Sequence, residues 1–248
     1  HGFDSFAEGL RAGVETYHSL KAELKADGLL GGVGDEGGFC PNLPANEEGL
    51  KYMVRAIEGA GYSTDEMGIA LDVAATEFHH DDGYHMDGKV LSSEDLADVY
   101  SGWLDEYPIV SIEDGFGEDD WRGWTLFTKR EGHRVQTVGD DLFVTQSERL
   151  AQGIEIGAAN AMLVKLNQVG TVTETLEAMD MATTHGFNNV ISHRSGETED
   201  VTIADLAVGT RAGQIKTGAP SRSDRVAKYN QLLRISADVD EYRSPFNR

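Results

Sequence analysis

Residues 109–116 read IVSIEDGF, a short apolar segment that ends in two acidic residues, a glycine and a phenylalanine. In a β-strand, successive side chains point to opposite faces, so Ser111 and Glu113 share one face and Val110 and Ile112 share the other. The bulky face suits packing against a layer of helices, and the small, polar face suits the opposite face of the sheet. The segment therefore predicts a strand of an α/β fold whose carboxyl end carries an acidic side chain.

The same kind of segment recurs along the chain. Six strands are expected, at residues 69–74, 109–113, 135–140, 161–167, 189–193 and 214–216. Stretches with apolar residues three and four apart lie between them and are typical of amphipathic helices. This alternation predicts a parallel sheet with helices outside it, as in a TIM-type barrel. Because that barrel needs eight strands, we expect an incomplete one with about six of the eight, the first two being absent.

The first sixty residues contain helix signals and no strand candidate. Apolar residues at helical spacing from Phe6 to Leu24 predict one helix, and a second is expected over 46–60. Ser92 and Asp95 stand at the spacing of a capping box, which marks a helix start. Gly186 marks the end of a helix that finishes near His185.

Composition excludes several classes of protein. The 248 residues carry 43 acidic and 21 basic side chains, a net charge of −22, which argues against a nucleic-acid partner. No run reaches the roughly 18 apolar residues of a membrane span. A single cysteine, Cys40, excludes an internal disulfide framework and fits a reducing, cytoplasmic location. The acid excess favours a halophilic source over an ordinary acidic cytosolic protein.

Each expected strand ends in a polar or ionisable residue, in chain order Asp72, Glu113, Asp140, Lys165, His193 and Lys216. The carboxyl ends of parallel strands carry the chemistry of such folds. Three carboxylates from successive strands form an oxygen-only ligand set of the kind that suits Mg²⁺. The alternative is a buried acid cluster neutralised by arginine, but no arginine lies near these strand ends. By strand alternation, Asp114 and Asp141 are expected to point away from the centre.

The two lysines of this set are candidates for a general base. Lys165 and Lys216, close to a divalent cation and to each other, would experience like-charge repulsion that favours the uncharged form. The alternative for each lysine is a surface salt bridge.

Three further motifs have a simpler explanation than the one they first suggest. Residues 32–37 fit the dinucleotide pattern G-x-G-x-x-G, but no strand precedes them, so we expect a bent loop that brings Asp35 or Glu36 towards a site. His193 with Ser195 lacks a nucleophile elbow, which argues against an acyl-transfer triad. A histidine-rich stretch is expected to be a solvated loop rather than a transition-metal site. It contains His79, His80 and His85 with Asp81 and Asp82.

Over essentially its whole length the chain resembles the enolase (phosphopyruvate hydratase) family. The matching motifs are GVGDEGGFCPNL at 32–43, IALDVAATEF at 69–78, SIEDGF at 111–116, VGDDLFVT at 138–145, LVKLNQVGT at 163–171, SHRSGETED at 192–200 and QIKTGAP at 214–220. The resemblance implies a lyase that interconverts 2-phosphoglycerate and phosphoenolpyruvate plus water in glycolysis. It also implies a homo-oligomer, either dimer or octamer, with a small-molecule substrate and no nucleic-acid or membrane partner.

The resemblance also assigns roles to individual residues. Asp72, Glu113 and Asp140 would bind Mg²⁺, and Lys165 would remove the proton from carbon 2. Glu36 would assist departure of the carbon-3 hydroxide. Arg194 and Ser195 would bind the phosphate group of the substrate. His193 and Lys216 would also contact the substrate.

On this interpretation residues 1–248 are the C-terminal catalytic barrel domain, without its first two strands and the N-terminal domain. The family uses two Mg²⁺ per active site, and ligands for one are present here. The isolated chain is therefore expected to be inactive. Two alternatives stay open: another acid-sugar dehydratase of the same superfamily, and a non-catalytic acidic binding module. The run at residues 193–195 and the GDEGG loop argue against the first.

Overall fold

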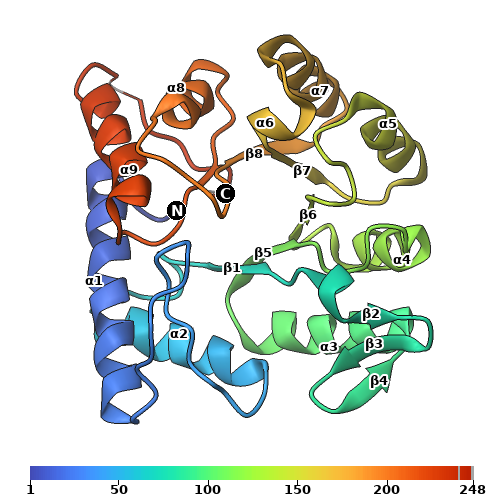
Figure 1. Cartoon of the computed structure of the whole chain (residues 1–248), viewed down its shortest axis with the longest axis horizontal. Helices are drawn as coiled ribbons and strands as arrows, with labels where there is room; N and C mark the ends of the chain where they lie inside the picture. Colours follow the sequence, from blue (N-terminus) through green and yellow to red (C-terminus); the bar gives the residue numbers. More distant parts are fainter. Residues whose placement is uncertain (240, 247–248) are drawn as a thin grey trace. The chain divides into compact units, whose positions relative to one another are not determined.

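The computed structural model describes residues 1–239 and 241–246 (Figure 1). The chain forms two compact units. Unit 1 consists of His1–Gly68 with Ile191–Arg248, and unit 2 is the continuous segment Ile69–Val190. Unit 2 holds most of the strands, and unit 1 contains the first and last helices. Within the described residues, no helix combines the length and the apolar character that a membrane span requires.

Six strands make up the larger sheet, and they confirm the expected α/β class. In sheet order they are β1 (Ile69–Asp72), β5 (Ile109–Glu113), β6 (Gln136–Gly139), β7 (Ala161–Val164), β8 (Asn188–Ser192) and β9 (Ile215–Lys216). The pairs β1–β5, β5–β6, β6–β7 and β8–β9 are parallel. Several strands end earlier than predicted, so that Asp140, Lys165 and His193 each come directly after a strand rather than inside it.

Helices follow the strands of unit 2 in the predicted alternation. They are α3 (Ser93–Glu106), α4 (Trp121–Glu131), α5 (Ser147–Ile156), the short α6 (Leu166–Val169) and α7 (Val172–Thr184). The expected capping box is present, because Ser92 and Asp95 bond reciprocally at the start of α3. Gly186 follows α7 in the left-handed conformation that ends helices, with φ 78°.

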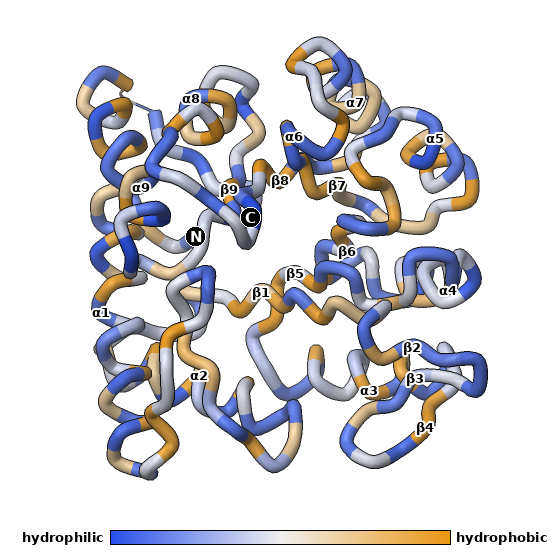
Figure 2. The backbone as a smooth tube through the Cα atoms, viewed as in Figure 1, coloured by the Kyte–Doolittle hydropathy of each residue, from blue (hydrophilic) through white to orange (hydrophobic). Residues whose placement is uncertain are grey.

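Two buried groups stabilise unit 2. Val138, Ala161, Leu163 and Val190 pack together along the strands, and Figure 2 shows the apolar character of this part of the sheet. Aromatic rings from α3, α4, the loop after β5 and the strand β3 (Gly83–Met86) form the second group, all at most 1% exposed: Tyr84, Tyr100, Phe116, Trp124 and Phe127. They meet mostly edge to face, the geometry that ring quadrupoles favour. Burial of each such ring contributes roughly 1.5–3 kcal/mol.

A small antiparallel sheet replaces the loop expected around the histidines. After the 3₁₀-helix η1 (Ala75–Phe78) come β2 (His79–His80), β3 (Gly83–Met86) and β4 (Lys89–Leu91). Asp87 and Gly88 both have positive φ and form a two-residue turn, a strong hairpin signal that an interpretation based on the histidines overlooked. The three histidines are exposed, as a solvated segment requires, and His85 contacts Asp82 at 2.7 Å.

Unit 1 is built from α1 (Phe6–Ala26), α2 (Glu47–Gly59), α8 (Thr202–Gly209) and α9 (Ser223–Ser236), with the β8–β9 pair. The two predicted N-terminal helices are confirmed within two residues of their expected bounds. Helix α1 packs against α2 and α9, and α8 packs against α9. Ser5 caps α1 by accepting a hydrogen bond from the Glu8 amide.

Candidate functional site

The three predicted metal ligands lie at the ends of neighbouring strands of unit 2. Asp72 stands opposite Glu113 in the β1–β5 register, and Glu113 stands opposite Val138, two residues before Asp140. Glu113 and Asp140 are buried, at 6% and 8% exposure, whereas Asp72 is exposed. Because the strands are parallel neighbours, their carboxyl ends share one edge, as the sequence predicts. The donor set consists of carboxylate oxygens, which fits Mg²⁺.

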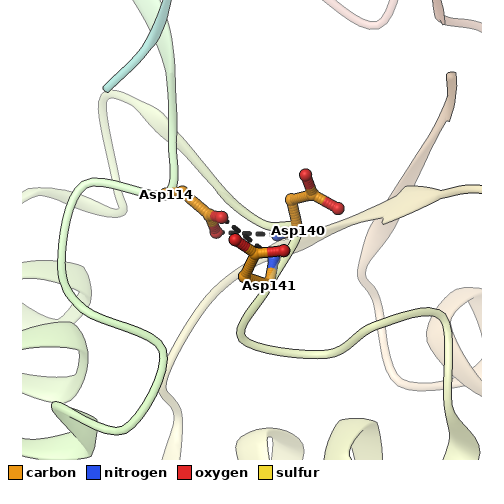
Figure 3. A group of neighbouring side chains, drawn as sticks. All are labelled: Asp114, Asp140 and Asp141. Atoms are coloured by element: carbon orange, nitrogen blue, oxygen red, sulfur yellow. Dashed lines mark hydrogen bonds between the residues drawn. The ribbon is translucent and has the colours of Figure 1, made fainter. Parts of the chain in front are cut away.

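Asp114 ties two of these strand ends together. Its buried carboxylate accepts hydrogen bonds from the backbone N–H groups of Asp140 and Asp141, at 2.8 and 2.9 Å (Figure 3). Burial raises the pKa of Asp114 to about 7, and the charges of Asp140 and Asp141 add to the effect. Strand alternation predicted that Asp114 points away from the centre. It could not show that the side chain binds the backbone of the turn after β6.

A second grouping of acids shares Asp140. Asp114, Asp140 and Asp141 each offer an oxygen, and these atoms lie within 4.8 Å of one another. In Figure 3 the carboxylates of Asp114 and Asp141 face each other, while that of Asp140 points away from them. The two oxygens of Asp114 already accept backbone hydrogen bonds, which leaves Asp114 a weaker candidate ligand than Asp140.

Lys165 lies at the end of β7, and its ammonium group forms an ion pair with the Asp140 carboxylate. Both side chains are largely buried, with 16% and 12% exposed. The backbone N–H of Lys165 donates to the hydroxyl of Thr145 at 3.0 Å, and Thr145 is fully buried. The predicted base and one predicted metal ligand are thus in direct contact.

Strained backbone follows the strand ends that carry these acids. Ala74, Asp114, Val144 and Thr145 all have positive φ, between 42° and 56°. Such conformations are costly for residues other than glycine, most of all for the β-branched Val144 and Thr145, and they concentrate at functional sites. The turn that contains the left-handed residues Val144 and Thr145 places the Thr145 hydroxyl within hydrogen-bond distance of the Lys165 backbone N–H.

The glycine-rich segment of unit 1 is the bent loop that the sequence predicts. Val33 and Phe39 form an isolated antiparallel bridge, and the Gly34 amide donates to the Gly38 carbonyl at 2.8 Å. Gly37 has φ 85°, and a Cβ there would lie 2.8 Å from the Ser221 carbonyl oxygen, so only glycine fits without a shift. The loop presents Glu36 and belongs to no strand–helix unit, which excludes a dinucleotide site.

Glu36 reaches His193, the residue directly after β8. The Glu36 Oε2 atom lies 3.3 Å from Nε2 of His193, whose side chain is only 2% exposed. This contact lowers the pKa of Glu36 to about 2, with hydrogen bonding to His193 as the largest cause. Lys216 ends the neighbouring strand β9, and its carbonyl accepts the His193 amide at 3.0 Å. Two strand-end residues and the loop acid therefore gather within unit 1.

Two buried cations of α9 hold the loop after His193, and sequence reasoning missed both. Arg225 and Lys228 are 0% exposed. Arg225 donates to the carbonyls of Arg194 and Ser195, both at 2.8 Å, and Lys228 binds the Thr198 carbonyl. The one available signal was a pair of basic residues three apart in a helix, a pattern that usually indicates a solvated face.

Comparison with known proteins decides the family. The family model for the enolase C-terminal TIM barrel domain matches residues 1–245. The chain belongs to the enolase family. It is 57% identical to an enolase from Kineococcus radiotolerans over 241 residues, which is 97% of this chain and 56% of that relative. The chain thus spans about half the length of this curated enolase. Membership confirms the predicted resemblance and the TIM-type barrel class.

Proposed function

We propose that this chain carries catalytic residues for the interconversion of 2-phosphoglycerate and phosphoenolpyruvate plus water, the hydro-lyase reaction of enolases. The observation that supports the proposal most strongly is the contact between Lys165 and Asp140 at the ends of neighbouring strands. It joins a candidate base to a candidate metal ligand in a largely buried setting. Family membership supports 2-phosphoglycerate as the proposed substrate.

Lys165 is the proposed base for the proton on carbon 2. That proton lies beside a carboxylate and is very weakly acidic, so its removal needs a neutral amine held in place and nearby positive charge. Mg²⁺ bound by Asp72, Glu113 and Asp140 would supply positive charge against the substrate carboxylate. The Thr145 hydroxyl fixes the backbone of Lys165. The ion pair shows that the Lys165 side chain reaches Asp140, and Mg²⁺ bound by Asp140 would take the place of the ammonium as the partner of this carboxylate.

Glu36 and His193 are proposed to handle the carbon-3 hydroxide. With a pKa of about 2, Glu36 is ionised at neutral pH. In the hydration direction, the ionised carboxylate accepts a proton from the attacking water. By microscopic reversibility, the same pair returns that proton to the departing hydroxide. Arg194, Ser195 and Lys216 are proposed to hold the substrate, since a guanidinium suits a phosphate group.

Finer expectations from the family are also proposals. They are a role in glycolysis, a second Mg²⁺ bound with the substrate, a cytoplasmic location and a homo-oligomer of two or eight chains. Analytical ultracentrifugation tests the oligomeric state.

The activity is tested in a chimera in which this chain replaces the matched 241 residues of the Kineococcus radiotolerans enolase. Dehydration of 2-phosphoglycerate is followed by the ultraviolet absorbance of phosphoenolpyruvate. The chimera should be active, and K165M should lower kcat by at least about 100-fold, the lower range for loss of a general base. K129M, which alters an exposed lysine of α4, is the matched control. An inactive but folded chimera, or a K165M loss below about tenfold, would contradict the proposal.

A further inference from the structure

Arg225 makes four hydrogen bonds from the buried face of α9, and one of them ends on a histidine ring. Its Nη1 atom lies 2.6 Å from Nδ1 of His193 and 2.8 Å from the Arg194 carbonyl oxygen. Its Nη2 atom donates to the carbonyls of Asp35 at 3.0 Å and Ser195 at 2.8 Å. The guanidinium therefore binds both the loop that presents Glu36 and the loop that follows β8.

The chemistry of arginine decides which ring nitrogen carries the proton. A guanidinium is always protonated and offers donors only, so the atom 2.6 Å from it must accept. Nδ1 of His193 is then the acceptor, and the proton of the uncharged ring lies on Nε2. Nε2 is the atom that faces Glu36 Oε2 at 3.3 Å.

We propose that Arg225 is a positioning residue that holds His193 in the Nε2-protonated form, with this N–H directed at the Glu36 carboxylate. The catalytic consequence rests on the proposed function: the Nε2–H group holds the Glu36 carboxylate, which exchanges the proton at carbon 3, in a fixed orientation before substrate arrives. Arg225 acts through His193 and needs no contact with the substrate.

The surroundings of Arg225 are built closely around it. A Cβ on Gly218 would lie 2.8 Å from Cδ of Arg225 and 2.6 Å from the Glu36 carbonyl oxygen, so this residue must be small. Gly218 also has φ 84°, which favours glycine independently. The Asp224 carboxylate lies 3.3 Å from Nε of Arg225 and offsets its charge. Charged groups around the Glu36–His193 pair thus include Arg225 and Lys216, and Asp224 contacts the guanidinium of Arg225.

The direct test is nitrogen NMR of the histidine side chains in the full chain at neutral pH. Long-range ¹H–¹⁵N correlation spectra distinguish a protonated ring nitrogen from an unprotonated one. H193Q identifies the His193 signals among the eight histidines. Wild type should show an unprotonated, hydrogen-bonded Nδ1 and a protonated Nε2. In R225M the Nδ1 signal should shift, because its donor is lost, and R225K should restore part of the wild-type shift.

R222Q is the matched control for these variants. Arg222 lies three residues before Arg225, contacts Asp35 and Asp224, and is 44% exposed. Its loss should leave the His193 signals unchanged. A proton on Nδ1 in the wild-type protein, or a His193 spectrum that is the same in wild type, R225M and R225K, would overturn the proposal.

A kinetic comparison in the chimera separates positioning from general loss of structure. R225M should lower dehydration by at least about tenfold, the lower range for loss of the partner that orients a metal-bound histidine. Exchange of the carbon-2 proton, the task proposed for Lys165, should change by less than about threefold. Equal losses of both in a folded R225M protein, or loss of neither, would contradict the proposal. Because the NMR result does not depend on turnover, it decides the tautomer even if the proposed reaction is wrong.

Discussion

Two carboxylic acids of this chain have pKa values displaced in opposite directions, and their partners explain why. Asp114 is surrounded by protein and lies beside Asp140 and Asp141, so burial and like charge raise its pKa to about 7. Glu36 is 44% exposed and faces His193, so hydrogen bonding lowers its pKa to about 2. Residue type alone predicts neither value. Burial decides the charge of Asp114 at neutral pH, and the His193 partner decides that of Glu36.

Glu131 gives a pH-dependent prediction of stability. This residue is 6% exposed and accepts hydrogen bonds from Arg134 and Ser101, both at 2.6 Å. The Arg134 contact lowers the pKa of Glu131 below its ordinary value of 4.5. Its ionised form therefore stabilises the fold above that pH, and the contribution is lost as the pH falls through the lowered folded value.

Replacement by glutamine should remove this contribution. We expect E131Q to lower the free energy of unfolding at pH 7 by about 1–3 kcal/mol, the usual cost of an impaired buried hydrogen-bond group. The dependence of stability on pH in the acid range should also be shallower than in wild type. Urea unfolding at several pH values measures both effects. E94Q breaks an exposed ion pair with Arg122 and should cost at most about 1 kcal/mol; equal losses in the two variants would contradict the assignment.

The sequence pointed to some residues of the candidate site and not to others. Strand alternation and strand ends pointed to Glu113, Asp140 and Lys165, because these side chains follow directly from the pleat of parallel strands. Asp114 was expected to point away from the centre, and Arg225 was not considered, because both bond backbone atoms far away in the chain. Such contacts depend on tertiary structure, which no spacing rule describes.

At the scale of elements, the strand–helix alternation was predictable and the details of the turns were not. The six strands and the two N-terminal helices were found because their apolar patterns are regular. The small sheet β2–β3–β4 was missed although Asp87–Gly88 is a hairpin turn, because the histidines drew the interpretation towards a loop. Four strand ends were placed one to three residues late, because the residues that directly follow these strands were counted as part of them.

The turn after β6 is held by Asp114, the residue directly after β5. In wild type the two Asp114 oxygens accept hydrogen bonds from the backbone N–H groups of Asp140 and Asp141. D114N keeps one of these acceptors and replaces the other with an NH₂ group, which cannot accept a hydrogen bond from a backbone N–H. Asp140 would then be less well oriented, and we expect Mn²⁺, used as a spectroscopic substitute for Mg²⁺, to bind about 10–100-fold more weakly. Electron paramagnetic resonance titration of the full chain measures this affinity. D119N changes an exposed acid nearby and should leave it unaltered; wild-type affinity in D114N would refute the role of Asp114.

At the scale of the whole molecule, the acid excess should make stability depend on salt. Even if every basic residue paired with one acidic residue, 22 acidic charges would remain. Their mutual repulsion is strongest at low ionic strength, where the Debye length is longest. The exposed ion pairs that salt weakens each contribute little. We therefore expect molar KCl to raise the melting temperature measured by circular dichroism; a melting temperature independent of KCl would show that net repulsion is unimportant.

The central claim is that Lys165, in contact with the Asp140 carboxylate, removes the carbon-2 proton, while Glu36 acts in a separate step at carbon 3. Exchange of the carbon-2 proton with deuterated solvent, followed by proton NMR of 2-phosphoglycerate in the chimera with Mg²⁺, tests it most directly. K165M should abolish exchange, whereas E36Q should retain exchange while losing dehydration by at least about 100-fold. Exchange at the wild-type rate in folded K165M, or its loss in E36Q but not in K165M, would contradict this assignment.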